Sequence, residues 1–332
     1  MELSAETRRD MFWTMLLARR LDERAWALHR QGRIAFHISG IGHEAAQVGA
    51  AFAMKRGTDY VAPYYRDLAL LLAFGYSPSD FVLALMGKRE DATSGGRQMP
   101  SHWSYRKANI LSHSSPVATQ AVHATGIALA MKMRKDEKVV LTTIGEGSTS
   151  QGEWYEAVNW AAIHMLPVIF MVQNNQYAIS VPADKQMAVK SSAEKACGLG
   201  LPGITVDGND LFATYAAFKE AADLARGGGG PTVIETRIYR ITPHSSDDDD
   251  RSYRSREEVE HHKRQDGLIR ARAALENEGV LNAEVLQEME TKAKRIVDEA
   301  VQYAEAAPYP DPDEARGPVY SEEIQAQEAS HA

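Results

Sequence analysis

The chain has 332 residues, of which 44% are hydrophobic and 25% charged, and its formal net charge at pH 7 is -8. This is the composition of an ordinary globular protein with one large or two modest domains, and the acidic balance argues against a nucleic-acid partner. The single cysteine, Cys197, excludes an intramolecular disulfide framework and suits a reducing compartment. We expect this cysteine to be a small packed residue.

The N-terminus carries no sign of a targeting or membrane segment. It lacks the basic stretch, apolar core and small-residue cleavage site of a secretory signal. Nowhere does an apolar run approach the ~18 residues that a membrane span needs. We therefore expect a cytoplasmic protein that has no membrane partner.

The N-terminal third is expected to be mainly helical. Apolar residues recur at helical spacing from Phe12 onward, which predicts an amphipathic helix that ends near Gly32. Two more helices are expected at 42–54 and 65–75. The polar stretch at 86–112 has a Gly-Gly pair and little periodicity, and its aromatic and basic content favours an ordered binding loop.

The middle of the chain alternates between strands and helices. Its strands are almost continuously apolar, which indicates a mostly parallel sheet covered by helices on both faces. The expected elements are a helix at 121–133, a strand at 138–145, a helix at 153–165, strands at 166–175 and 203–208, a helix at 211–227 and a strand at 231–242. We expect an α/β fold in which residues 1–306 form one domain with helical N-terminal and C-terminal extensions, followed by an acidic, proline-containing tail at 307–332.

Two loops in this region carry residues suited to chemistry. Gly145-Glu146-Gly147 follows one apolar strand, and Asn174-Asn175 follows the next. Because the carboxyl ends of parallel strands meet at one edge of a sheet, we expect the two loops to lie together. An acid and an amide oxygen suit Mg²⁺, while the glycines and the following helix N-terminus suit a phosphate group. The pattern therefore predicts a metal that holds a diphosphate.

A dinucleotide-binding loop is the alternative from another class of protein. A G-x-G-x-x-G motif needs glycine at the position of Ser150, and the acid expected after the second strand is replaced by Gln173 and two asparagines. Both departures count against an NAD(P)-binding oxidoreductase. A non-catalytic scaffold subunit is a third hypothesis, and it predicts no cofactor binding.

The two loops resemble the motif of thiamine diphosphate enzymes. Together with "GRQMPSHW", "SSPVATQ" and "YRITPHSSDDDDRSYR", they resemble the α subunit of the first component of a 2-oxo acid dehydrogenase, over about residues 11–259. Related α subunits that act on pyruvate or acetoin usually have Asp at the centre of the first loop. Glu146, Gln98-Met99-Pro100 and His244-Ser245 fit the branched-chain group better. The resemblance implies a thiamine diphosphate-binding fold that depends on Mg²⁺.

The resemblance also implies roles for particular residues. It implies that Mg²⁺ is held by Glu146, Asn175 and the main-chain carbonyl of Tyr177. It implies cofactor contacts from Tyr65, Arg66, Ser115, Gly147, Ser148, Asn175 and His244, with Arg66 and His244 on the diphosphate. The residues that match the family's potassium loop are Ser114, Pro116, Thr119 and Gln120. Candidates for the wall of an apolar substrate pocket are Phe36, Tyr64 and Met99, and candidates for stabilising charge and moving protons are His244 and His102.

Two departures from the family pattern qualify these expectations. The family often has Arg where this chain has Gln173, so one diphosphate contact is expected to be missing. The run from Asp247 to Asp250 is more acidic than usual, which argues against a dedicated regulatory phosphorylation at Ser245. Two interpretations of this acidic run stay open: a solvated face, or a loop that orders when the cofactor binds.

The reaction that the resemblance implies is decarboxylation of a branched 2-oxo acid and reductive acylation of a lipoyl group. A pyruvate or acetoin dehydrogenase is the alternative within the family. The chain has one diphosphate-binding unit and no evident second one, whereas in the family a glutamate that activates the cofactor lies on a β subunit. We therefore expect an α₂β₂ heterotetramer that is active only with its β subunit and that works with a lipoylated acyltransferase.

Overall fold

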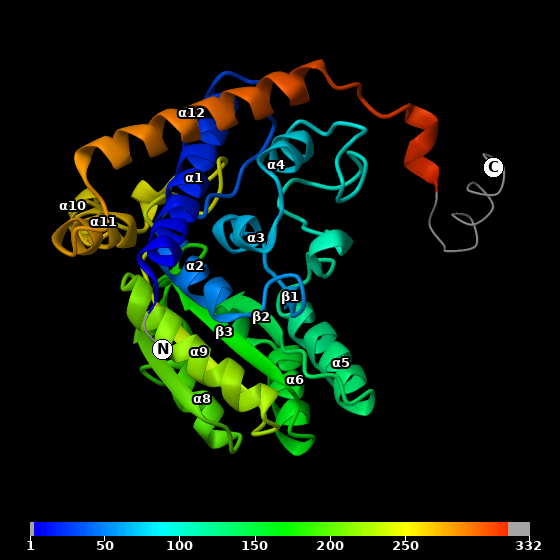
Figure 1. Ribbon diagram of the computed structural model, residues 1–332. Helices are drawn as coiled ribbons and strands as arrows, with labels where there is room; N and C mark the ends of the chain where they lie inside the picture. The colour runs from blue at the N-terminus through cyan, green and yellow to red at the C-terminus, as the bar shows by residue number, and fades with distance from the viewer. Residues whose placement is uncertain (1–2, 318–332) are drawn as a thin grey trace.

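Five strands form the central sheet of the protein, whose computed structural model describes residues 3–317. The strands lie in the order β1-β2-β3-β7-β6, and every neighbouring pair is parallel (Figure 1). They comprise β1 (Tyr60–Ala62), β2 (Val140–Gly145), β3 (Val168–Asn174), β6 (Gly203–Asp207) and β7 (Thr232–Arg237). The expected α/β fold with a mostly parallel sheet is confirmed.

The central strands are buried on both faces. Alternate residues of a strand point to opposite sides of the sheet, so Ile169 and Met171 of β3 join one hydrophobic core while Phe170 and Val172 join the other. Strands that face two cores have almost continuous apolar sequences. This is the physical reason why the sequence pattern indicated the sheet.

Helices cover the two faces of the sheet (Figure 1). The helices on one face pack so closely that a Cβ atom at Gly49 would lie 2.9 Å from the carbonyl oxygen of Leu211, and only glycine fits there. That face is covered by α2 (Glu44–Ala53) and α9 (Leu211–Arg226). The opposite face is covered by α5 (Thr119–Met133), α6 (Gly152–Ile163) and α8 (Ser192–Gly198).

Helical extensions from both ends of the chain pack above the sheet, and the long α12 crosses the top of Figure 1. The first extension contains α1 (Ala5–Arg30), α3 (Leu68–Phe74) and α4 (Pro78–Leu85), and the second contains α10 (Arg256–Lys263), α11 (Gly267–Asn277) and α12 (Ala283–Ala306). The expected helical extensions are confirmed. Within residues 3–317, no helix is long and apolar enough to cross a membrane.

Two local expectations need correction. The strand predicted at 231–242 ends at Arg237. The next residues still run beside the end of β3 and the loop after it, since Ile238 N–H donates to the carbonyl of Asn174 at 3.0 Å and Arg240 N–H to that of Asn175 at 3.2 Å. Cys197 was expected to be packed but is exposed. The buried face of α8 is formed by Ser192, Ala193 and Ala196, so the next residue along the helix turns outward.

The long loop expected at 86–112 is present and is bonded internally. The carboxylate of Asp91 accepts the backbone N–H groups of Thr93 at 2.9 Å and Ser94 at 3.1 Å, and a single 3-10 turn, η1 (Arg106–Ala108), interrupts the loop. The start of the predicted tail lies against it, since Lys88 Nζ donates to the carbonyl of Ala307 at 2.9 Å. The rest of the tail contains η4 (Pro312–Arg316) up to Gly317, and residues 318–332 lie outside the described part of the chain. The domain boundary at 306 stays a prediction.

Candidate active site

The fold brings the predicted metal ligands together at the carboxyl edge of the sheet. Glu146 opens the 3-10 turn η2 (Glu146–Ser150) directly after β2, and Asn175 follows β3, its neighbour in the sheet. The backbone N–H of Asn175 donates to Glu146 Oε2 at 3.2 Å. The N–H of Tyr177 donates to Asn175 Oδ1 at 3.3 Å. The three residues that the resemblance assigns to Mg²⁺ therefore form one cluster.

The carboxylate of Glu146 is the strongest sign that this cluster suits a cation. The residue is 1% exposed, and its Oε1 atom has no hydrogen-bond partner among the described residues. Burial raises the pKa of Glu146 to about 7. A buried carboxylate oxygen without a partner is costly, and a bound cation removes that cost. One carboxylate, one amide and one carbonyl fit Mg²⁺, which takes few protein oxygens and completes its shell with phosphate and water.

The carbonyl of Tyr177 belongs to a short hairpin of β4 (Tyr177–Ala178) and β5 (Val181–Pro182). Arg240 holds this hairpin, because its guanidinium donates to the carbonyl of Tyr177 at 3.1 Å and to that of Ile179 at 2.6 Å. Ile179 has a φ of 57°, which is rare for a β-branched residue, and its side chain is 57% exposed. A strained apolar residue beside the loop that follows β3 points to a functional contact.

The turn after Glu146 packs closely against the hairpin of β4 and β5. A Cβ atom at Gly147 would lie 2.7 Å from the Cβ of Ala178, so only glycine fits. The turn is held from outside by Gln186 of α7 (Ala183–Gln186), whose Nε2 donates to Ser150 Oγ at 2.6 Å. Lys195 of α8 donates to the carbonyl of Thr149 at 3.1 Å. These two supports come from short helices that the sequence pattern did not predict.

Arg66 and His244, both of which the resemblance assigns to the diphosphate, contact each other. The guanidinium of Arg66 donates to His244 Nδ1 at 2.9 Å and to the His244 carbonyl at 2.8 Å. A guanidinium has only donors, so Nδ1 is an acceptor and the neutral ring carries its proton on Nε2. Burial, with Arg66 next in importance, lowers the pKa of His244 to about 4. The ring of Tyr65 lies 6.1 Å from that of His244. This places a neutral N–H donor beside an arginine.

His102 lies at the same edge of the site. Its Nδ1 donates to the carbonyl of Met99 at 3.1 Å, which leaves Nε2 to hydrogen-bond with the Ser115 hydroxyl. The ring of His113 lies 5.3 Å from that of His102 and 6.2 Å from that of Tyr65. Burial lowers the pKa of His113 to about 4. The sequence offered no reason to select His113, which joins the site through its ring contacts with His102 and Tyr65.

The three residues expected to line a substrate pocket are not joined by any described hydrogen bond or ring contact. Tyr64 is 3% exposed and lies beside Tyr65, with 4.9 Å between ring centroids, and its hydroxyl has no partner among the described residues. Met99 is 55% exposed. Phe36 is half-buried. An apolar pocket built from these residues stays a prediction.

In the predicted potassium loop, Gln120 is the buried member. Its Nε2 donates to the carbonyl of Thr143 at 3.0 Å, and its Oε1 has no partner in the described part of the chain. Ala118, just before α5, has a φ of 73°. A buried amide oxygen without a donor is compatible with a cation, but occupancy of this loop by K⁺ stays a prediction, as do ligand roles for Ser114, Pro116 and Thr119.

Gln173, which replaces an arginine of the family pattern, sits in a buried hydrogen-bond network. Its Nε2 donates to Asp67 Oδ1 at 2.6 Å, and its Oε1 accepts from Gln47 Nε2 at 3.1 Å. Asp67 also accepts from Tyr64 N–H at 2.9 Å and from the Thr143 hydroxyl. Burial raises the pKa of Asp67 to about 7, although these hydrogen bonds lower it.

The pH dependence of stability should report on Asp67. Between pH ~4 and pH ~7 the folded chain keeps a proton on this carboxyl that the unfolded chain has released, so the free energy of unfolding falls as pH rises through that window, by up to about 3–4 kcal/mol. Asp67→Asn should flatten this contribution. Urea unfolding of the wild type and of Asp67→Asn at several pH values measures the free energy of unfolding of each. An equal dependence of this free energy on pH in the two proteins would contradict the prediction.

The acidic run at 247–250 is partly solvated and partly bonded within the chain, since Asp247 and Asp249 are exposed while Asp248 and Asp250 are half-buried. Asp248 accepts the backbone N–H of His244 at 2.8 Å and the hydroxyl of Tyr253. The other contacts are ion pairs, of Asp249 with Arg251 at 2.7 Å and of Asp250 with Arg254 at 2.5 Å. The bond to Asp248 holds the backbone N–H of His244 in place. Whether cofactor binding orders the loop further stays a prediction.

Ser245 lies in the same loop and is 8% exposed. Its Oγ accepts the N–H of Asp247 at 3.4 Å, while Ser246 Oγ accepts the N–H of His37 at 3.0 Å. A modifying enzyme would have to open the loop to reach Ser245. The expectation that Ser245 is not a dedicated phosphorylation site stays a prediction.

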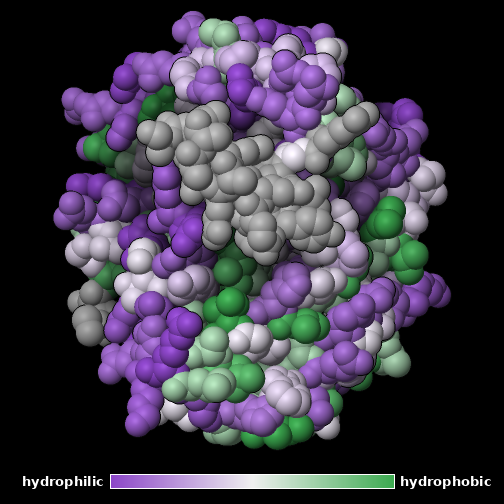
Figure 2. All heavy atoms as spheres, turned by 90° about the vertical axis from the view of Figure 1, so that its right-hand side faces the viewer, coloured by the Kyte–Doolittle hydropathy of each residue, from purple (hydrophilic) through white to green (hydrophobic). Residues whose placement is uncertain are grey.

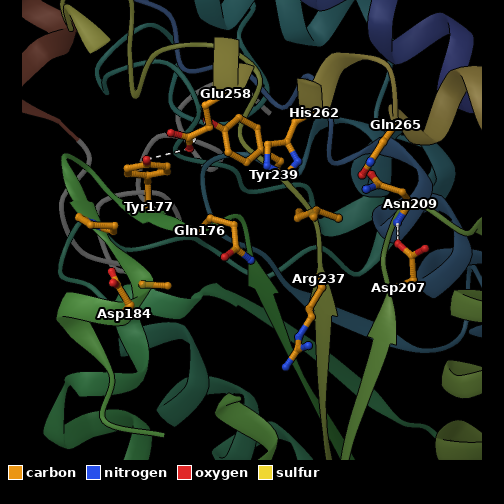
Figure 3. Close-up of a pocket in the computed structure, with 13 residues that line it drawn as sticks. Gln176, Tyr177, Asp184, Asp207, Asn209, Arg237, Tyr239, Glu258, His262 and Gln265 are labelled. Carbon is orange, nitrogen blue, oxygen red and sulfur yellow. Dashed lines mark hydrogen bonds between the residues drawn. The ribbon is translucent and has the colours of Figure 1, made fainter. Parts of the chain in front are cut away.

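A cavity of about 410 Å³ lies between α10 and the loop after β3, where Gln176 and Tyr177 line it. Figure 3 shows the side chains of Tyr177 and Tyr239 converging on Glu258, to which both hydroxyls donate at 2.8 Å. The ring of His262 stacks on Tyr239, with 3.9 Å between centroids. The side chain of Tyr177 is thereby anchored in this cavity while its backbone faces Asn175.

Comparison with known proteins identifies the class of protein. A model of the family described as "Dehydrogenase E1 component" matches residues 13–313, and the chain therefore belongs to the dehydrogenase E1 component family. It is 54% identical over 312 residues to the 2-oxoisovalerate dehydrogenase subunit alpha of Bacillus subtilis, covering 94% of each chain.

More distant relatives include both substrate branches. The chain is 39% identical over 321 residues to a 3-methyl-2-oxobutanoate dehydrogenase subunit alpha of Mycobacterium tuberculosis, covering 97% of this chain and 84% of the relative. It is 38% identical over 296 residues to a pyruvate dehydrogenase E1 component subunit alpha of Staphylococcus aureus, covering 89% of this chain and 76% of the relative. The resemblance seen in the sequence is confirmed, and these relatives argue against the alternative of an NAD(P)-binding oxidoreductase. Membership of this family implies dependence on thiamine diphosphate in general, and an α subunit implies a β subunit as partner.

Proposed function

We propose that this chain is the α subunit of a branched-chain 2-oxo acid dehydrogenase, which decarboxylates a branched 2-oxo acid and reductively acylates a lipoyl group. The observation that carries the proposal is the cluster of Glu146, Asn175 and Tyr177 at the carboxyl ends of neighbouring strands, with an unpaired buried carboxylate oxygen. The branched substrate is supported by the 54% identity to the Bacillus subtilis 2-oxoisovalerate dehydrogenase subunit.

In this proposal the chain's residues bind and orient the cofactor. Glu146, Asn175 Oδ1 and the carbonyl of Tyr177 hold Mg²⁺, and Arg66 places its guanidinium on the diphosphate. When bound, thiamine diphosphate supplies the carbanion chemistry that releases CO₂. The neutral ring of His244 presents Nε2–H as a hydrogen-bond donor to negative charge in the site. The remaining proposed cofactor contacts are Tyr65, Ser115, Gly147 and Ser148, and His102 is the second candidate for moving protons.

The partner surface that we propose for the β subunit is the outer face of α5 and α6. Figure 2 views the molecule from the side where α5 lies, and hydrophobic areas interrupt the polar surface in its lower half. The exposed apolar side chains of α5, α6 and the turn that follows are Val122, Met133, Tyr155, Trp160, Ile163 and Met165. A monomer rarely exposes so many large apolar residues in one region. This surface supports a protein partner, and the family resemblance implies that the partner is a β subunit in an α₂β₂ heterotetramer that works with a lipoylated acyltransferase.

A substitution at Gly126 tests this surface. Nothing lies within 4 Å of the position that a Cβ atom would take at Gly126, so the chain itself has room for Gly126→Leu. We expect the variant to keep or slightly raise its melting temperature, because leucine favours a helix over glycine, yet to lose assembly with the β subunit in size-exclusion chromatography. Glu288→Leu, on the exposed side of α12, is the control. Unimpaired assembly of the Gly126 variant would contradict the assignment of this face.

Substrate preference tests the branched-chain assignment. The chain, co-expressed with its β subunit, is supplied with 3-methyl-2-oxobutanoate or pyruvate, thiamine diphosphate, Mg²⁺ and an artificial electron acceptor. We expect higher kcat/KM with the branched acid. A preference for pyruvate would retain the metal site and the cofactor but move the chain to the pyruvate branch, to which the Staphylococcus aureus relative belongs. The cytoplasmic location stays a prediction.

A further inference from the structure

One fully buried side chain touches the metal cluster without being a ligand. His43 is 0% exposed and stands at the N-cap position of α2, where a side chain commonly accepts hydrogen bonds from the first turn. Its ring makes no such bond. Instead, His43 Nε2 lies 3.1 Å from Nδ2 of Asn175. The ring is thus turned away from its own helix and toward the loop after β3.

The neighbouring bonds fix which way the amide of Asn175 faces. The N–H of Tyr177 donates to Oδ1 at 3.3 Å, so the atom that faces His43 is the donor Nδ2. His43 Nε2 must then be an unprotonated acceptor. If the acceptor were missing, the amide could rotate and exchange its two ends. An amide NH₂ group cannot coordinate a cation, so this rotation would remove a metal ligand.

The position of His43 is itself held from three helices. The carboxylate of the next residue, Glu44, accepts the N–H of Gly42 at 2.8 Å and Arg19 Nε at 2.6 Å. Arg19 also pairs with Asp266, at the start of α11, at 2.8 Å. This buried ion triad ties α1, α2 and α11 around the turn that carries His43. The ring therefore meets Asn175 from a rigid support.

We propose that His43 is a positioning residue that holds the side-chain amide of Asn175 with Oδ1 facing the metal. The inference rests on the proposed function, because it concerns the Mg²⁺ site of that function. His43 contacts no metal in this account and acts only through Asn175. Partners of metal ligands commonly change metal affinity by about 10–100-fold when they are removed.

The test compares two substitutions in the complex co-expressed with its β subunit. His43→Gln keeps a hydrogen-bond acceptor, and His43→Leu has none. Mn²⁺ replaces Mg²⁺ as the probe, and free Mn²⁺ is measured by electron paramagnetic resonance in the presence of thiamine diphosphate. We expect His43→Leu to weaken Mn²⁺ binding about 10–100-fold and His43→Gln to restore most of the affinity. Wild-type affinity in His43→Leu, or equal losses in both variants, would overturn the proposal.

A second measurement needs no substitution that could disturb folding. In the wild-type complex labelled with ¹⁵N-histidine, His43 is expected to carry its proton on Nδ1 and none on Nε2. A proton on Nε2 would overturn the proposal. A wild-type complex that binds no Mn²⁺ would contradict both the proposed function and the role of His43. A wild-type complex that binds Mn²⁺ no better than His43→Leu sinks the inference alone.

Discussion

Glu146→Gln is expected to abolish cofactor-dependent turnover of the complex and to weaken Mg²⁺ binding by more than about 100-fold. Glu146 is the only carboxylate of the proposed ligand set, and a charged oxygen contributes far more to binding a hard divalent cation than an amide does. The fold should survive, because burying an amide with an unpaired atom costs less than burying a carboxylate in that state. Calorimetric titration with thiamine diphosphate in the presence of Mg²⁺ measures the effect.

The chain offers a matched control for this variant. Glu235, on β7, is also fully buried, but its carboxylate serves the backbone N–H of Ser192 and the side chain of Arg237. Glu235→Gln should therefore leave cofactor binding within a few-fold of the wild type. Equal losses from both substitutions would mean that general destabilisation, not the loss of a ligand, explains the result. Tight cofactor binding by Glu146→Gln would remove the metal assignment altogether.

His244→Asn is expected to reduce lipoyl acylation by about 10²–10⁴-fold, the usual contribution of a proton-moving or charge-stabilising side chain. Asparagine can place an oxygen where His244 Nδ1 accepts from Arg66, so the contact that holds the guanidinium is retained. The donor at Nε2 is lost. Affinity for thiamine diphosphate should consequently fall much less than the acylation rate.

The comparison with His244→Ala separates the two nitrogen atoms of the ring. The alanine variant loses both the acceptor for Arg66 and the Nε2 donor, so we expect it to lose cofactor affinity as well as acylation. Steady-state acylation of a lipoylated acceptor and calorimetric binding of the cofactor provide the two measurements. Near-normal acylation by His244→Asn would show that the Nε2 donor is not required, and His244 would leave the set of proton-moving candidates.

The two loops of the proposed Mg²⁺ site could be predicted from the sequence because their signals are local. β2 and β3 are apolar runs that end in Gly145 and Asn174, and neighbouring parallel strands bring such ends together whatever the rest of the chain does. Arg66 and His244 lie 178 positions apart, so no spacing pattern links them. Only the family resemblance selected both residues, and the contact of Arg66 with His244 Nδ1 then indicates which ring nitrogen carries the proton.

The parts that could not be predicted depend on contacts between distant segments. His43 and Asn175 are 132 positions apart, and Arg240 reaches the hairpin after β3 from a segment beyond β7. None of these residues stands out in composition or periodicity. The acidic run was ambiguous because a row of aspartates is usually solvated, whereas here Asp248 accepts bonds from its own loop. The substrate pocket could not be derived at all, since Met99 is exposed and the pocket is expected to be completed by the β subunit.

The most direct test of the central claim is release of CO₂ from 3-methyl-2-oxobutanoate by the purified chain, by its β subunit and by the two together. Each sample is assayed with and without thiamine diphosphate and Mg²⁺, with an artificial electron acceptor present. We predict release only from the complex and only with both cofactors, because in the proposed function this chain binds the diphosphate and the metal while the β subunit supplies the rest of the site. Full turnover by the chain alone, or turnover by the complex without the cofactors, would contradict the account.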